Sequence, residues 1–262
     1  MLEPVYPLAV QRYVDLSRFC DVTAAKADSA EIVRCVSEAE AADARAGHAL
    51  MAAAQMERGI RMEAAKSLDT GKLTRRFAGI AARELRRRGE ERGNMRRCFL
   101  GGPTAEGCVW RFDSVDALCS RVYELDDSLG LAAEELEKLG AAAVGKGWDV
   151  IACLSPAEPA RMEHLLISGL GLGFVTSRPG MRYSGTPYRR IRVDAMTEID
   201  NRGKLRFESK LASALKDEAV SALREARDAR LRLESIYRPY VDFDGVEALA
   251  VVEASRLLSW MS

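Results

Sequence analysis

Two long runs with helical periodicity constrain the fold of this chain more than any other feature. Residues 24–66 are rich in alanine and nearly free of Gly and Pro, and residues 204–237 repeat this pattern. Apolar residues recur in both runs at intervals close to three and four, which places them on one face of a helix. These positions are Ile32, Val36, Ala39, Ala46, Leu50, Met56 and Ile60 in the first run, and Leu211, Leu215, Ala219, Ala222, Ala226, Leu233 and Ile236 in the second.

Each run is expected to fold back on a shorter helix. The first breaks at 67–73 and continues as a helix over 73–88, whose Leu73, Phe77, Ile80 and Ala81 would face the long helix. The second breaks at 237–245, where Pro and Gly stop it, and a last helix runs from Val246 to Trp260. The sequence therefore predicts two helical hairpins.

The two hairpins are interpreted as an internal repeat. Each follows a segment that contains Tyr and Pro, at 6–16 and at 186–196. Residues 1–90 would then match the back part of 98–262.

The region between the hairpins has a different sequence pattern, in which short β-prone runs are separated by segments that contain glycine. A strand at 121–125, a helix at 131–146 and a strand at 148–154 would form one right-handed crossover unit. The fold class expected here is α/β with a mainly parallel sheet. The β-prone runs are 97–100, 108–112, 121–125, 148–154, 171–177 and 189–193.

Composition excludes several classes of function. The 39 basic and 39 acidic side chains balance, so no global field favours nucleic acid or an anionic membrane. Six cysteines without a CxxC pair and only two histidines argue against a structural zinc site, and we expect buried, reduced thiols. The first 16 residues carry charges and have no long apolar core, so we expect neither a signal peptide nor a membrane span and a cytoplasmic location.

Four segments together resemble a family of bacterial P-loop ATPase-like proteins, which carry tandem repeats and are mostly uncharacterised. The segments are FLGGPTAEGCVWRFDS (99–114), RVYEL (121–125), the stretch 148–177, and YRPYVDF (237–243). The resemblance implies a P-loop NTPase-like layered core. The chain would hold one complete repeat and the helical tail of a preceding one, as in a shortened or truncated protein.

Three parts are expected on this basis. Residues 1–95 would be a helical hairpin that remains from a first repeat, with an Arg-rich linker. Residues 96–195 would be the degenerate P-loop-like α/β core, and residues 196–262 the helical hairpin of the second repeat.

The chain departs from the family at the phosphate-binding loop. The family has a Walker A loop, GxxxxGK[ST], directly after the strand that corresponds to 121–125; its glycines expose backbone N–H groups, its lysine neutralises phosphate charge and its hydroxyl holds Mg²⁺. The matching stretch here is DDSLGLAAEE (126–135). Gly130 and Ser128 are the vestigial loop positions, whereas apolar residues stand where the lysine and the hydroxyl belong: Leu131, Ala132 and Ala133.

The acidic residues of this loop oppose a polyphosphate. Asp126 and Asp127 would each repel a phosphate charge at about 4 Å by roughly 1–4 kcal/mol, depending on screening. We expect Asp127 or Ser128 to cap the free N–H groups of the following helix, which a phosphate would otherwise bind. The run 171–177 also ends in Thr176 and Ser177, without the aspartate that supports magnesium.

The expected function is that of a P-loop NTPase relative which has lost its phosphate-binding loop: a non-catalytic scaffold or interaction protein, with a protein partner on the long helices and no cofactor. The alternative is an ATPase or nucleotide kinase-like protein that binds ATP and Mg²⁺ through non-standard contacts, or with a partner or an upstream repeat. A third hypothesis is an RNA-associated module that uses the arginine-rich stretch 75–97, with Arg86, Arg87 and Arg88. A solvated helix end and linker is preferred for that stretch, because no aromatic residue for base stacking is interleaved among its arginines after Phe77.

Two further features carry no assigned chemistry. GGPTAEG (101–107) is expected to be a turn between strands. His164 follows the strand 148–154 together with Ser155, Glu158 and Glu163, which could form an acid–base set. We interpret His164 as a surface or loop residue and His48 as a packing or surface residue of its helix.

Overall fold

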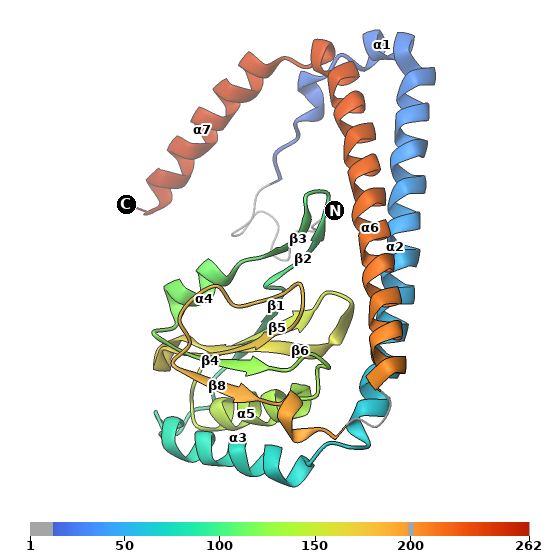
Figure 1. Cartoon of the computed structure of the whole chain (residues 1–262). Coiled ribbons are helices and arrows are strands. Elements are labelled where there is room, and N and C mark those ends of the chain that lie inside the picture. The colour runs from blue at the N-terminus through green and yellow to red at the C-terminus, as the bar shows by residue number, and fades with distance from the viewer. Residues whose placement is uncertain (1–12, 199–201, 262) are drawn as a thin grey trace. The chain divides into compact units, whose positions relative to one another are not determined.

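The computed structural model describes residues 13–198 and 202–261 (Figure 1). The chain divides into two compact units, Ala42–Arg224 and Met1–Ala41 with Glu225–Ser262. Helices α2 (Ser29–Ala65) and α6 (Arg202–Tyr237) contribute residues to both units. The expected repeat and the boundaries at 95 and 195 stay predictions, and most of the Tyr/Pro segment 6–16 lies outside the described residues.

The larger unit holds a six-stranded sheet in the order β1-β5-β6-β7-β4-β8. Five strands run parallel to one another and only β6 runs antiparallel to its two neighbours, so the α/β class and the mainly parallel sheet are confirmed. The strands are β1 (Met95–Cys98), β4 (Arg121–Asp126), β5 (Val150–Ser155), β6 (Glu158–Ile167), β7 (Leu172–Ser177) and β8 (Arg189–Arg192).

Strand β6 is not among the β-prone runs predicted from the sequence. Its first half contains Pro159 and several charged residues, which interrupt any apolar pattern. The structure turns directly from β5 into β6 and buries the second half completely, from Met162 to Ile167. The charged residues of the first half, Glu158 and Arg161, form ion pairs with other residues. The local sequence pattern does not predict these pairs.

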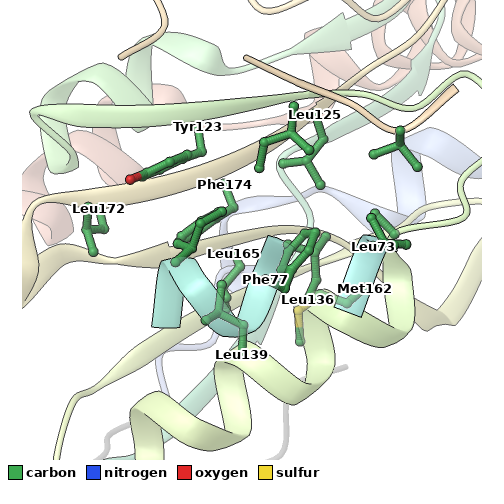
Figure 2. Packing of buried hydrophobic residues seen from close by; sticks show 14 of the residues in the cluster. Leu73, Phe77, Tyr123, Leu125, Leu136, Leu139, Met162, Leu165, Leu172 and Phe174 are labelled. Carbon is green, nitrogen blue, oxygen red and sulfur yellow. The ribbon is translucent and has the colours of Figure 1, made fainter. Parts of the chain in front are cut away.

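Helices cover both faces of the sheet, as a parallel sheet requires. On one face, α5 (Ala133–Gly145) and α3 (Thr70–Glu84) pack on a cluster that includes Tyr123, Leu165 and Phe174 (Figure 2). The rings of Tyr123 and Phe174 stack at 5.0 Å between centroids. On the other face, the short helix α4 (Phe112–Leu118) buries Phe112 and Val115. This helix has no counterpart among those predicted from the sequence.

Helix α3 packs differently from the expected hairpin. Leu73, Phe77 and Ile80 are buried, as predicted, but their neighbours are α5 and the sheet (Figure 2). The Asp69 carboxylate caps the first turn by accepting from the N–H of Lys72 at 2.8 Å. Periodicity correctly identified the apolar face of α3, but not what it packs against.

The partner of α2 within the larger unit is α6. Ala46 and Ala49 of α2 form one buried cluster with Ala219 and Ala222 of α6, and the two helices lie side by side in Figure 1. Small side chains repeated at helical spacing let two backbones approach closely. Salt bridges join the same helices: Arg45 Nε lies 3.4 Å from Glu218 Oε1, and Lys216 pairs with Glu57.

In the smaller unit, backbone hydrogen bonds join the segment before α1 (Val22–Ala25) to the segment between α6 and α7 (Phe243–Met261). The N–H of Asp21 donates to the carbonyl of Tyr240 and the N–H of Asp242 to the carbonyl of Phe19, each at 2.8 Å. The Asp21 carboxylate also caps helix α1. Helix α7 follows a one-turn break after α6, near the predicted position. Exposed apolar side chains on α7 are Phe243, Val251, Val252, Leu257 and Leu258.

The remaining elements are short. Strands β2 (Gly101–Thr104) and β3 (Gly107–Trp110) form a separate antiparallel hairpin, so the GGPTAEG stretch comprises all of β2, the turn and the first residue of β3. Among the described helices, none is both long and apolar enough to cross a membrane. Single 3-10 turns lie at Ser17–Phe19, Lys26–Asp28, Ser168–Leu170, Asp194–Met196 and Arg238–Tyr240.

Candidate functional site at the carboxyl edge of the sheet

The loop between β4 and α5 lies at the carboxyl edge of the parallel strands, where α/β sheets usually bind ligands. Asp127 is the first residue of this loop and is only 1% exposed. Its Oδ1 accepts from the N–H of Leu131 at 2.8 Å, and its Oδ2 accepts from the N–H of Ala132 at 2.9 Å. The Asp127 carboxylate thus binds the two amides immediately before α5. The N-cap residue of α5 is Ala132 and no side chain caps the helix, so the expectation that Asp127 or Ser128 caps its first turn is wrong.

The vestigial loop positions lie beside Asp127. The N–H of Ser128 donates to both carboxylate oxygens of Asp194, at 3.0 and 3.1 Å. Gly130 has a φ of +70°, a left-handed conformation that glycine adopts without strain. The amides of Ser128, Leu131 and Ala132 are thus bonded to carboxylates of the chain itself.

Two carboxyl groups of the loop region, those of Asp127 and Asp194, have raised pKa values. Burial raises the pKa of Asp127 above its usual value, although its bonds from Ala132 and Leu131 favour the ionised form. Burial also raises the pKa of Asp194, and the charge of Asp126 raises it further. A polyphosphate at this loop would add negative charge beside Asp127 and Asp194, whose ionisation is already disfavoured.

Two arginines, Arg61 and Arg161, lie beside Gly130 in this loop. A Cβ built on Gly130 would lie 2.9 Å from Nη1 of Arg161, which comes from β6, and 3.8 Å from Cδ of Arg61 on α2. Glu158 pairs with both arginines; its Oε2 is 3.4 Å from Nε of Arg161. The side chains of Arg61 and Arg161 are only 17% and 10% exposed, so this network is mostly buried.

Glu163 extends the network. Its Oε1 lies 2.9 Å from Nη2 of Arg178 and 3.3 Å from Nη2 of Arg161, and its side chain is 1% exposed. Its other oxygen, Oε2, has no hydrogen-bond partner among the described residues. The pairing of Glu158 and Glu163 with these arginines could not be predicted from the sequence, because it depends on the formation of β6.

The interpretation of His164 as a surface or loop residue is wrong. His164 lies in β6 and is fully buried, and burial lowers its pKa to about 4. Its Nδ1 accepts from the N–H of Thr176 at 3.1 Å, so the neutral ring carries its proton on Nε2. Nε2 lies 3.8 Å from Oε2 of Glu163. His48, by contrast, is exposed on α2.

This tautomer argues against an acid–base set with Ser155. A general base needs a free ring nitrogen, and in His164 one nitrogen accepts a backbone bond while the other holds the proton. Ser155 ends β5, is fully buried, and its Oγ has no partner among the described residues. The set therefore lacks the hydrogen bond that would activate a serine.

The end of β7 is occupied by structural hydrogen bonds. Thr176 Oγ1 donates to the carbonyl of Glu163 at 2.7 Å, and Ser177 Oγ accepts from the N–H of Tyr183 at 3.0 Å. Within the ranges that the structure describes, no group of three or more His, Cys, Asp or Glu residues is placed to hold a metal ion.

The arginine-rich stretch has an aromatic neighbour that the sequence did not reveal. Nε1 of Trp148 donates to the carbonyl of Arg86 at 2.7 Å, and the guanidinium of Arg88 lies 5.3 Å from the centre of the Trp148 ring. Trp148 comes from the turn before β5, about 60 residues later in the chain. The ring holds the stretch in place after α3, while the side chains of Arg86, Arg87 and Arg88 are exposed.

Comparisons with protein-family models, with curated proteins and with solved structures find no match for this chain.

Proposed function

We propose that this chain is related to the P-loop NTPases, has lost its phosphate-binding loop, and acts as a non-catalytic scaffold or interaction protein. The observation that supports this most is the position of Asp127. Its carboxylate accepts from the amides of Leu131 and Ala132, the last two loop residues before α5, where a phosphate-binding loop would present its own amides to a phosphate. The Asp127 carboxylate occupies the position of a bound anion, and a nucleotide would have to displace this buried side chain.

The interaction role is supported by helix α7. Val251, Val252, Leu257 and Leu258 are each more than half exposed, and none of the described side chains of this helix is buried. Apolar side chains on nearly all sides of a helix are typical of one that is covered in its functional state.

One observation favours the alternative of ATP binding through non-standard contacts. Arg61 and Arg161 flank Gly130 and could supply the positive charge that a Walker A lysine normally provides. Both are already paired with Glu158, so a nucleotide would have to compete with that carboxylate as well as with Asp127.

Calorimetric titration of the full chain with ATP and Mg²⁺ separates the two. We expect no binding heat at micromolar concentrations. Micromolar binding that Arg161→Gln weakens, while the exposed control Arg76→Gln does not, would overturn the scaffold proposal and support the alternative.

A further inference from the structure

Two cysteines on neighbouring strands lie in direct register. Cys98 ends β1 and is paired with Cys153 of β5 in the parallel ladder. Register partners in a parallel pair project from the same face, and neighbouring strands lie about 4.8 Å apart, inside the range of Cα separations that disulfides tolerate. The two Sγ atoms are 3.7 Å apart, so side-chain rotation can bring them to bonding distance.

We propose that Cys98 and Cys153 form a reversible disulfide, which makes the β1 edge of the sheet a site of thiol oxidation. All six cysteines are free in the structure, which therefore represents the reduced state. The disulfide would tie β1, an outer strand of the sheet, covalently to β5.

The difference in exposure between Cys98 and Cys153 predicts which thiol is oxidised first. Cys98 is half-buried on the outer strand, whereas Cys153 is fully buried. A hydroperoxide reaches Cys98 first: its thiolate attacks the peroxide, the O–O bond breaks, and the products are a sulfenic acid and an alcohol or water. The Cys153 sulfur then attacks Sγ of Cys98; the S–S bond forms, the S–O bond breaks, and the hydroxyl leaves as water with the Cys153 proton.

The second step is expected to be the slower one. Burial, and the neighbouring Cys98, raise the pKa of Cys153, so little of it is thiolate at neutral pH. Cys119 is a competing thiol. It packs in the same apolar cluster, and burial raises its pKa to about 11.

The test is a peptide map of the full chain after treatment with hydrogen peroxide. Trypsin leaves Cys98 and Cys108 in one peptide, residues 98–111, so the experiment uses Cys108→Ser, a change at an exposed position of the β2–β3 hairpin. Remaining thiols are alkylated and the digest is analysed without reduction. We expect a linked pair of peptides, 98–111 with 147–161, lighter than their sum by two hydrogens and separated by dithiothreitol.

A stability measurement gives a second readout. The oxidised protein should show a higher Tm than the reduced protein, because the cross-link restricts the unfolded chain. Cys153→Ala should abolish both the linked peptides and the Tm rise, and leave Cys98 trapped as a sulfenic acid that dimedone labels. Peroxide treatment that links Cys98 to Cys119 instead, or oxidises Cys98 to sulfinic acid without a link, would overturn the proposal.

Discussion

Oδ1 of Asp127 accepts a 2.8 Å hydrogen bond from the main-chain N–H of Leu131, four residues further along the same loop. The other carboxylate oxygen binds the next amide, so the loop before α5 is closed by its own side chain. Buried amides without a partner are costly, and this one carboxylate satisfies two of them.

Removing the Asp127 carboxylate should destabilise the protein. In Asp127→Ala the N–H groups of Leu131 and Ala132 lose their acceptor, and we expect the free energy of unfolding to fall by about 1–3 kcal/mol in urea denaturation. Inorganic phosphate should restore part of the loss, because the anion can bind the vacated amides. The matched control is Asp126→Ala, one residue earlier; if both variants unfold alike with and without phosphate, Asp127 has no special role.

Acidification should destabilise the protein through His164. Burial lowers its folded-state pKa to about 4, against about 6.5 in the unfolded chain, so the unfolded state binds the proton more tightly between these values. The contribution of His164 to stability is complete above about pH 6.5 and is lost as the pH falls toward 4, by about 3 kcal/mol.

Unfolding free energies measured between pH 4.5 and 7 check this. His164→Asn keeps an acceptor for the Thr176 amide but cannot be protonated, so its stability should vary less with pH than that of the wild type. His48→Asn, at an exposed position on α2, should retain the wild-type profile. Identical profiles for all three proteins would contradict the prediction.

The contact between α2 and α6 should not tolerate larger side chains. Ala46 is 1% exposed and packs with Ala219 and Ala222, so Ala46→Leu forces the helices apart at a cost of about 1–3 kcal/mol. Ala44→Leu, two residues earlier on the exposed side of α2, should be close to neutral in the same urea titration. Equal effects of the two substitutions would argue against close packing at Ala46.

Helix α3 should be essential to the sheet core. Phe77 is 2% exposed among side chains of α5 and the sheet, and Phe77→Ala should cost about 3–5 kcal/mol. Arg76→Ala changes an exposed neighbour and should have little effect. Hydrogen exchange adds a second criterion: amides of β7 and α5 should lose protection in Phe77→Ala, and unchanged protection there would mean that α3 is not part of this core.

Local patterns predicted much of the secondary structure. The periodicity of residues 24–66 and 204–237 corresponds to α2 and α6, and the run 121–125 corresponds to β4, because spacing along the chain determines which side chains share a face. The acidic loop also indicated that a phosphate would be disfavoured, since like charges repel wherever the loop lies.

Pairing between distant segments was much harder to predict. Leu73 and Phe77 form an apolar face that suits α2 as well as it suits α5, and periodicity holds no information that separates the two partners. Strand β6 was missed for a related reason: Arg161 and Glu163 look like loop residues until ion pairs with each other and with Arg178 let them be buried.

The sequence by itself determined the approximate positions of helices α2, α5 and α6, the α/β class and the acidity of the loop after β4, because these depend on neighbours within a few residues. The tertiary structure decided that α2 pairs with α6, that His164 is buried and neutral, and that Cys98 meets Cys153. Such contacts join residues far apart in the chain, and burial and register exist only once the sheet has formed.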